Sequence, residues 1–279
     1  MMETYRELVL NNNVKVASIS LGTWKTPKDL TADVVKMAVE AGYRAIDTAD
    51  AYRNEKEVGK GVRECGLPRE EIYVTTKLWN KNQGRKETLQ AFHNSLEVMD
   101  IDYIDQFLIH WPCPAYDQYV ETYQAMEEIL ESGKVRTIGV CNFNIEHLER
   151  LLKECNIVPA VNQIEMHPML IQPELIKYCQ EHKIQIEAYS PLMHGGEILK
   201  NETMAKIASK YNKSTAQVSI RYLLQLGARV IVKSTHKHRM EENINVFDFT
   251  LSEEDMAVIE TLNKGIRTCG DPATMNYRG

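Results

Sequence analysis

The chain has 279 residues, of which 43% are hydrophobic and 26% are charged, and its formal net charge is −6. A chain of this size and composition buries a sizeable core, either as one large α/β domain or as two smaller ones. The acidic balance argues against a nucleic-acid partner, because binding to phosphates needs a clustered basic face. No segment approaches the roughly 20 apolar residues that span a bilayer, and the first residues do not resemble a signal peptide. We therefore expect a cytoplasmic protein that binds neither membrane nor nucleic acid.

The six cysteines are scattered along the chain and form no C-x-x-C pair. We expect them to be reduced thiols that pack as small hydrophobic groups. Among the eight histidines, only His236 and His238 are close in sequence. One turn of a basic loop is a poor set of zinc ligands, so we expect no metal site.

The first element expected from the N-terminus is a β-hairpin over residues 7–17, with its turn at the three asparagines 11–13. It is followed by eight short runs of apolar and β-branched residues. Most of these runs are near-continuous, as in parallel strands that helices cover from outside. They comprise residues 16–21, 43–46, 72–76, 104–109, 135–140, 160–165, 184–189 and 229–232.

Segments with helical periodicity and capping signals separate these runs. Gly42 follows the first of them as a C-cap, and Ser214 with Gln217 forms a capping box. The expected helices comprise residues 30–41, 83–99, 117–131, 145–154, 173–182, 216–226 and 253–262, with a further helix within 195–211.

Eight βα units without a linker predict one domain over residues 1–279, an α/β fold of the (β/α)8 TIM-barrel type. The N-terminal hairpin and extra helices near the C-terminal part would be added to it. A doubly wound sheet is the alternative, but it would want G-x-G-x-x-G after an early strand, and none is present.

Polar residues follow seven of the expected strands at their carboxyl ends, the face where barrel enzymes place their chemistry. Asp47, Lys77 and His110 follow the second, third and fourth strands. The later strands contain or reach Cys141, Asn142, Gln163, Tyr189, Ser190, Lys233 and Ser234. The basic run 233–239 fits a solvated loop and a phosphate site equally well.

Asp47, Tyr52 and Lys77 form a chemically coherent group. A tyrosine protonates a developing alkoxide only if its pKa, about 10 when free, comes nearer neutrality. A lysine ammonium ~4 Å away would lower that pKa by about three units. Asp47 would orient Lys77, and His110 could hydrogen-bond the substrate carbonyl. Taken singly, Tyr52 also fits a loop aromatic and His110 a buried core histidine.

Around these residues the chain resembles the aldo-keto reductase superfamily over almost its whole length. The segment GYRAIDTADAYRNEKEVGKGV contains Asp47 and Tyr52, TTKLWN contains Lys77, and LIHWP contains His110. GVCNF, VNQIEMHP, AYSPL and IVKSTHKHRMEEN follow in the family's order. The likeness is greatest to short bacterial-type members that reduce small aldehydes, glyoxals and keto-acid derivatives.

The resemblance implies NADPH-dependent reduction of aldehydes or ketones to alcohols, with Tyr52 as general acid in a tetrad with Asp47, Lys77 and His110. The substrate would be a small carbonyl compound, and we expect a monomer or weak oligomer. Asn142 and Gln163 would bind the nicotinamide carboxamide, and Tyr189 would stack on the ring. The full set implied for NADPH/NADP+ binding is Gly22, Thr23, Asp47, Cys141, Asn142, Gln163, Tyr189, Ser190, Leu192, Lys233, Ser234, Arg239 and Asn243. Of these, Lys233, Ser234, Arg239 and Asn243 would bind the 2′-phosphate end of the cofactor.

We expect Trp24, Trp79 and Trp111 to rim the substrate opening beside Tyr52 and His110, although packing under loops would also explain each tryptophan. The loop 112–118 is short and the tail after Lys264 is brief. A shallow pocket that accepts small or flat carbonyls is the resulting expectation.

Two residues depart from the family pattern. Cys141 stands where serine is usual, and because a thiol is a weak donor, the carboxamide would lose a hydrogen bond or depend on Asn142 and Gln163. Val232 replaces a proline before Lys233, which bears on the rigidity of that loop.

Two other functions remain open at this point. A barrel that binds NADPH only to sense or regulate would need no proton donor, and turnover of a reactive aldehyde separates it from a reductase. A metal-dependent hydrolase would need clustered His, Asp or Glu at the strand ends; the absence of zinc from the purified protein would exclude it.

Overall fold

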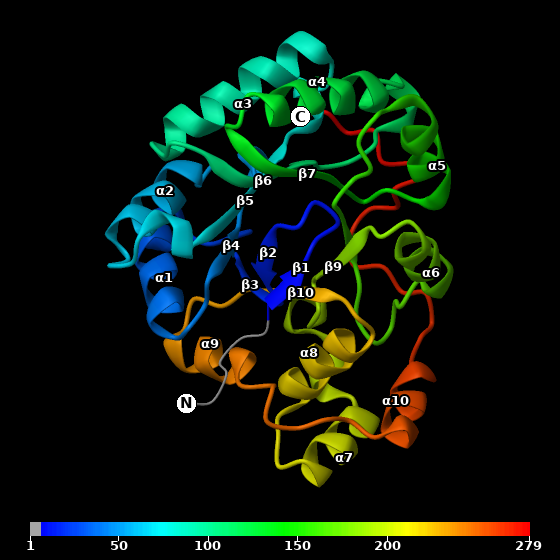
Figure 1. Cartoon of the computed structure of the whole chain (residues 1–279). Coiled ribbons are helices and arrows are strands. Elements are labelled where there is room, and N and C mark those ends of the chain that lie inside the picture. The colour runs from blue at the N-terminus through cyan, green and yellow to red at the C-terminus, as the bar shows by residue number, and fades with distance from the viewer. Residues whose placement is uncertain (1–6) are drawn as a thin grey trace.

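Eight parallel strands close into a barrel in the computed structural model, which describes residues 7–279 (Figure 1). The order around the barrel is β10-β3-β4-β5-β6-β7-β8-β9. The strands are β3 (Ile19–Gly22), β4 (Ala45–Asp47), β5 (Tyr73–Leu78), β6 (Ile104–Ile109), β7 (Val135–Cys141), β8 (Val161–Glu165), β9 (Gln185–Tyr189) and β10 (Arg229–Val232). This is the (β/α)8 barrel expected from the sequence.

The helices form a ring outside the barrel, and their apolar faces pack on the strands. They are α1 (Lys28–Glu40), α2 (Glu55–Glu64), α3 (Arg85–Met99), α4 (Tyr119–Glu131), α5 (Ile145–Glu154), α6 (Pro173–Glu181), α7 (Glu202–Lys210), α8 (Thr215–Gln225), α9 (Lys237–Ile244) and α10 (Glu253–Glu260). The additional helix expected within 195–211 is α7. None of the helices in the described part of the chain is long and apolar enough to cross a membrane.

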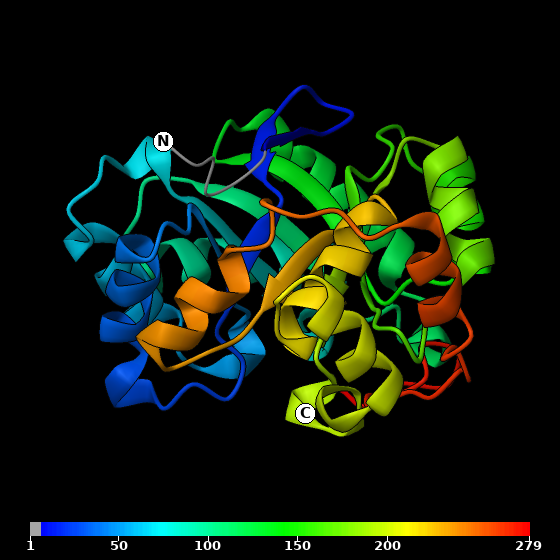
Figure 2. The ribbon, with the colours of Figure 1, turned by 90° about the horizontal axis from the view of Figure 1, so that it is seen from below.

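The two ends of the barrel are covered differently (Figure 2). The antiparallel hairpin of β1 (Glu7–Val9) and β2 (Lys15–Ala17) lies across the amino-terminal end of the strands. Asn11 and Asn12 of its turn donate side-chain hydrogen bonds to the backbone oxygens of Pro159 and Arg136. The tail after α10 lies at the opposite end. The hairpin therefore leaves the carboxyl ends of the strands as the face available for a site.

The expected strand 16–21 was wrong in its extent. β2 ends at Ala17, Ser18 forms a bend, and β3 begins at Ile19. The run is continuous in sequence because both strands are buried, β2 against the barrel end and β3 in the barrel wall. A buried pattern alone does not reveal that the chain changes direction inside it.

Two helices were not expected. In α2, charged residues and two glycines hide the helical pattern, and Gly59 is required there because a Cβ would come within 1.9 Å of the Met99 backbone oxygen. In α9, the basic run expected to be a loop becomes helical at Lys237, with Met240 and Ile244 buried.

Candidate active site

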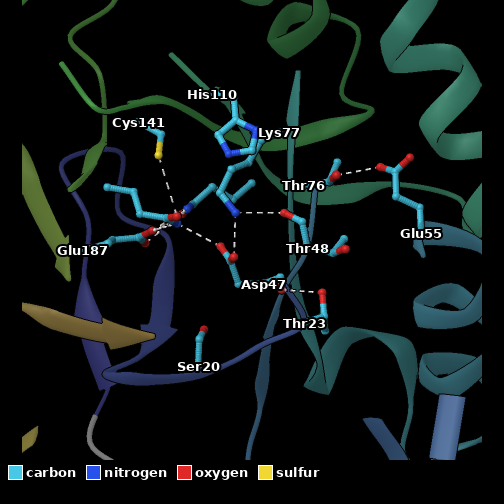
Figure 3. A network of polar contacts seen from close by, with 12 residues as sticks. Ser20, Thr23, Asp47, Thr48, Glu55, Thr76, Lys77, His110, Cys141 and Glu187 are labelled. Atoms are coloured by element: carbon cyan, nitrogen blue, oxygen red, sulfur yellow. Dashed lines mark hydrogen bonds and ion pairs between the residues drawn. The ribbon is translucent and has the colours of Figure 1, made fainter. Parts of the chain in front are cut away.

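A buried ion pair lies at the carboxyl ends of β4 and β5 (Figure 3). Lys77 Nζ is 2.6 Å from Asp47 Oδ1 and 2.9 Å from the backbone oxygen of Thr48. The Lys77 side chain is fully buried. Burial is the largest effect and opposes its charge, but Asp47, Tyr52 and Cys141 together outweigh it, and the pKa of Lys77 is raised above its ordinary value. The site therefore contains a permanent, fixed cation.

Tyr52 ends the short 3-10 helix Asp50–Tyr52 that follows β4, and this turn directs its ring into the site. Lys77 Nζ lies 5.2 Å from the centre of the Tyr52 ring. The His110 ring meets Tyr52 edge-on, with 5.8 Å between ring centres. The sequence-predicted tetrad of Asp47, Tyr52, Lys77 and His110 is thus assembled in one place.

The balance of effects on Tyr52 differs from the sequence-based expectation. Burial raises the pKa of Tyr52 above its ordinary value, and Lys77 lowers it only in part. The expectation considered the charges of Lys77 and Asp47, the second taking back part of the field of the first, and omitted the cost of removing a phenolate from water. The protonated phenol is therefore the stable form across the neutral range, as a proton donor requires.

His110 follows β6 and is held as a neutral imidazole. Burial and the nearby Lys77 cation both lower its pKa well below the ordinary value. Its Nδ1 has no hydrogen-bond partner among the described residues, and its ring packs against Trp79 at 5.4 Å. A neutral ring beside Tyr52 can offer a hydrogen bond to a polar ligand atom without adding charge.

The amides expected near the nicotinamide are already ordered by protein contacts. Asn142, which follows β7, donates to the backbone oxygen of His110 at 3.0 Å and accepts from the Tyr189 hydroxyl at 2.7 Å. Gln163 Nε2 donates to Asp47 Oδ2 at 2.8 Å. Cys141 Sγ lies 3.2 Å from Asn142 Nδ2 and 3.8 Å from Gln163 Oε1. Asn142 and Gln163 thus connect this group to the tetrad through His110 and Asp47.

Gly22 and Thr23 lie beside the tetrad at the end of β3. Gly22 pairs with Asp47, and a Cβ there would come within 3.1 Å of Ile231. Thr23 donates to the backbone oxygen of Asp47 from both its amide and its hydroxyl at 3.0 Å. After β9, Ser190 has a left-handed backbone with φ 53°, and Leu192 packs on the core.

The residues expected at the 2′-phosphate end lie just before α9 and within it. Lys233 and Arg239 are exposed, and neither forms an ion pair with an acidic residue within residues 7–279. Ser234 accepts from the backbone amide of His236 at 3.0 Å, and Asn243 is buried in α9. By contrast, Lys237 is paired with Glu40 at 2.8 Å. This leaves two cations next to a helix N-terminus, where an anion is favoured.

The tail after α10 is hydrogen-bonded to two elements at the face of the barrel that contains the tetrad. Glu165 at the end of β8 accepts from the backbone amides of Thr268 at 2.6 Å and Cys269 at 3.1 Å. Further along, Asn80 donates to the backbone oxygen of Tyr277 at 2.8 Å. The tail therefore bridges the end of β8 and the loop after β5.

Each of the three tryptophans lies in a loop at this face. Trp79 packs against His110 and, at 6.2 Å, against Tyr277 of the tail. Trp111 is mostly buried and has the tail at Gly270 beside it. Trp24 is 40% exposed and packs against His194 at 5.2 Å. Trp79 is the tryptophan that contacts the tetrad directly.

Sequence reasoning missed a polar network inside the barrel. Glu187 on β9 accepts from Gln163 Nε2 at 3.0 Å and pairs with Arg229 on β10. Gln106 on β6 donates to both Glu187 oxygens at 3.1 and 3.0 Å. Glu187 is fully buried and lies close to the Asp47 and Lys77 pair in Figure 3. Charged residues inside apolar strands were the signal that could have revealed it.

Within residues 7–279, no group of three or more His, Cys, Asp or Glu side chains is arranged to hold a metal ion. The polar atoms around Tyr52 belong to the ion pair of Asp47 and Lys77, to neutral amides and to an imidazole. This donor set suits hydrogen bonding to a carbonyl compound and a neutral carboxamide.

The chain resembles characterised oxidoreductases along nearly its full length. It is 49% identical to the 9,11-endoperoxide prostaglandin H2 reductase of Trypanosoma cruzi, with 96% of this chain and 95% of that protein covered. It is 48% identical to the glyoxal reductase of Bacillus subtilis, with 94% and 95% covered. A solved Bombyx mori aldo-keto reductase in complex with NADP superposes with a TM-score of 0.90 at 37% identity, covering 95% of each chain.

The family model described as "Aldo/keto reductase family" matches residues 18–264. That range includes every strand of the barrel and all four residues of the tetrad. The resemblance inferred from the sequence motifs is confirmed: the chain belongs to the aldo/keto reductase family and is an oxidoreductase.

Proposed function

We propose that this protein reduces the carbonyl group of small aldehydes or ketones to an alcohol, with NADPH as reductant and Tyr52 as proton donor. The observation that carries the proposal is the position of the Tyr52 ring between a buried lysine cation and a neutral histidine. The relatives named for glyoxal reduction and the neighbour that holds NADP support it.

The residues present fit the cofactor. Lys233 and Arg239 have no acidic partner among the described residues and would hold the 2′-phosphate, with Ser234 and Asn243 alongside. Gln163 and Asn142, with Cys141 between them, would hold the carboxamide, and the ring of Tyr189, tethered by Asn142, would face the nicotinamide. Gly22, Thr23, Asp47, Ser190 and Leu192 would line the remaining length. When bound, NADPH supplies the hydride.

The tetrad would supply the proton and the orientation. Tyr52 donates its hydroxyl proton to the carbonyl oxygen as negative charge develops there. Lys77 stabilises the phenolate that remains, and Asp47 keeps Lys77 charged and in place. His110 holds the carbonyl oxygen by a hydrogen bond. Trp24, Trp79 and Trp111 would line the opening of a pocket for small carbonyls such as glyoxals.

Replacement of the proton donor tests the proposal. Tyr52→Phe should reduce turnover of glyoxal or methylglyoxal by at least a hundredfold, because general acid catalysis contributes about 10²–10⁴ in rate. NADPH affinity should stay within about twofold of the wild type, since the hydroxyl acts in the chemical step. NADPH consumption followed by absorbance measures the first quantity, and fluorescence titration measures the second.

Near-normal turnover by Tyr52→Phe would exclude Tyr52 as the donor. A wild-type protein that binds NADPH but turns over none of a panel of reactive aldehydes would favour the regulatory barrel instead. Tyr116→Phe is a matched control, because Tyr116 is exposed in the loop after β6 and has no place in the tetrad.

A further inference from the structure

The side-chain amide of Gln163 is fixed in one orientation by two carboxylates. Its Nε2 donates to Asp47 Oδ2 at 2.8 Å and to Glu187 Oε2 at 3.0 Å. Both hydrogens of the amide nitrogen are thereby used, and a carboxylate only accepts hydrogen bonds. A flipped amide would place its own oxygen against two anionic oxygens. Gln163 Oε1, whose described contact is the weak one with Cys141 Sγ at 3.8 Å, is therefore left to accept from a ligand.

Glu187 can act in this way because it is itself held firmly. Its Oε1 pairs with Arg229 and its Oε2 accepts from Gln163, while Gln106 Nε2 donates to both oxygens. Arg229 donates in turn to the backbone oxygen of Ala17 at 2.7 Å and to the hydroxyl of Ser20. Both Glu187 and Arg229 are fully buried on neighbouring strands that pair at this point. The pair thus connects the hairpin end of the barrel with the amide beside the tetrad.

We propose that Glu187, held by Arg229, is a positioning residue that presents the carbonyl oxygen of Gln163 to the N–H group of the nicotinamide carboxamide. The inference rests on the proposed function, because that function places the carboxamide at Gln163. Glu187 touches neither cofactor nor substrate. It acts through Gln163, by excluding the amide orientation that would present a second donor to a carboxamide N–H.

Glu187→Gln changes this arrangement with little change in volume. The single oxygen of the new side chain is drawn to Arg229, so its NH2 group faces Gln163 Nε2. Donor then opposes donor, so that only Asp47 still favours the native orientation of Gln163, and the flipped orientation becomes more populated. The binding of a carboxamide N–H should weaken, whereas the adenosine end of the cofactor should bind as before.

Two dinucleotides that differ at one group make the test specific. The 3-acetylpyridine analogue of NADPH carries a methyl group where the carboxamide has NH2. The wild type should bind NADPH more tightly than this analogue, by about three- to tenfold for one neutral hydrogen bond. In Glu187→Gln the preference should fall towards one, since only Asp47 then holds the amide of Gln163. Adenosine 2′,5′-bisphosphate, the probe for the other end, should bind all variants equally.

A matched control separates positioning from stability. Asp105 is an equally buried carboxylate on β6, paired with Arg69 and Arg136 and not in contact with Gln163. Asp105→Asn also breaks a buried ion pair, and it should keep the wild-type preference. If Glu187→Gln does not fold, Glu187→Met combined with Arg229→Met removes both charges together, which buried pairs often tolerate. That double variant should lose the preference too.

The outcomes distinguish this inference from the function on which it rests. If the wild type does not bind NADPH, both are overturned. If Gln163→Leu loses the preference while folded Glu187 variants keep it, the inference alone is wrong. Loss of the preference in Asp105→Asn to the same extent would also overturn it, because the effect would then follow from destabilisation. Loss in the Glu187 variants alone supports it.

Discussion

Cys141 contacts the two amides beside the tetrad only through its sulfur atom, which forms weak hydrogen bonds. Its Sγ receives Asn142 Nδ2 at 3.2 Å and lies 3.8 Å from Gln163 Oε1. Burial raises the pKa of the Cys141 thiol, so the group stays protonated. A protonated thiol is a weak donor and a weak acceptor. The hydrogen bonds of Asn142 and Gln163 to Cys141 are therefore weak.

Cys141→Ser should strengthen NADPH binding. A hydroxyl at this position can donate to a carboxamide, and a neutral hydrogen bond contributes about 0.5–1.5 kcal/mol, or roughly two- to twelvefold in affinity. Fluorescence titration with NADPH measures the change. Cys65→Ser is the control, because Cys65 lies at the end of α2 and bonds only the local backbone of Val62. Unchanged or weaker binding in Cys141→Ser would mean that Asn142 and Gln163 already suffice.

The tetrad could be predicted residue by residue, whereas the network behind it could not. Asp47, Lys77 and His110 each follow an apolar strand, and that position is visible in the sequence. Glu187 and Arg229 lie inside strands, and their meaning depends on which strands are neighbours. The interior pairing of β9 with β10 and β8 is a property of barrel closure and register.

At the scale of elements, the tail depends on one carboxylate. Glu165 accepts from the backbone amides of Thr268 and Cys269, from the Thr268 hydroxyl, and lies 3.3 Å from His167 Nε2. Burial alone would raise the pKa of Glu165, but these hydrogen bonds outweigh it and lower the pKa to about 2. The anchor of the tail is therefore a stable carboxylate at neutral pH.

Glu165→Gln should loosen the tail and destabilise the protein in a pH-dependent way. A carboxylate whose pKa is lowered on folding stabilises above its unfolded pKa, about 4.3, and this contribution is lost as the pH falls towards 2. The contribution of the Glu165 carboxylate to the free energy of unfolding is on the order of 3 kcal/mol. Thermal unfolding should show a lower melting temperature for Glu165→Gln at neutral pH, with the difference from wild type closing in acid.

Hydrogen exchange at the Thr268 and Cys269 amides supplies the local measurement, and both should exchange faster in Glu165→Gln. Glu181→Gln, an exposed change on α6, should leave both quantities unchanged. A melting difference that stays constant from neutral pH to acid would contradict the assignment of Glu165 as the charged anchor.

Elements were predictable where periodicity and caps agreed, as in α8, whose capping box of Ser214 and Gln217 lies where the sequence placed it. They were not predictable where another requirement shaped the sequence. Glycine in α2 serves the close approach of α3, and the cations of α9 obscure its short buried face. The tail has no periodicity, because side-chain contacts with β8 and the loop after β5 hold it.

For the whole molecule, the net charge of −6 opposes the binding of an anion such as NADPH. A local cationic site must therefore overcome the average field. Lys233 and Arg239 have no acidic partner among the described residues, while Lys237 on the same helix is paired with Glu40. Removal of any one of these three cations changes the net charge by the same amount. Only Lys233 and Arg239, which have no acidic partner among the described residues, can donate to a phosphate without first breaking an ion pair.

Arg239→Ala should weaken NADPH binding by about tenfold, which is the contribution of one charge-assisted hydrogen bond after solvent screening. Binding of NADH, which lacks the 2′-phosphate, should change by less than twofold, and the salt dependence of NADPH binding should become flatter. Lys237→Ala is the matched control: it produces the same net charge, yet it removes a cation already neutralised by Glu40. Fluorescence titrations of both variants at several salt concentrations separate the two contributions. Equal losses in the two variants would assign the effect to the overall field, and equal wild-type affinities for NADPH and NADH would exclude Lys233 and Arg239 as the phosphate site.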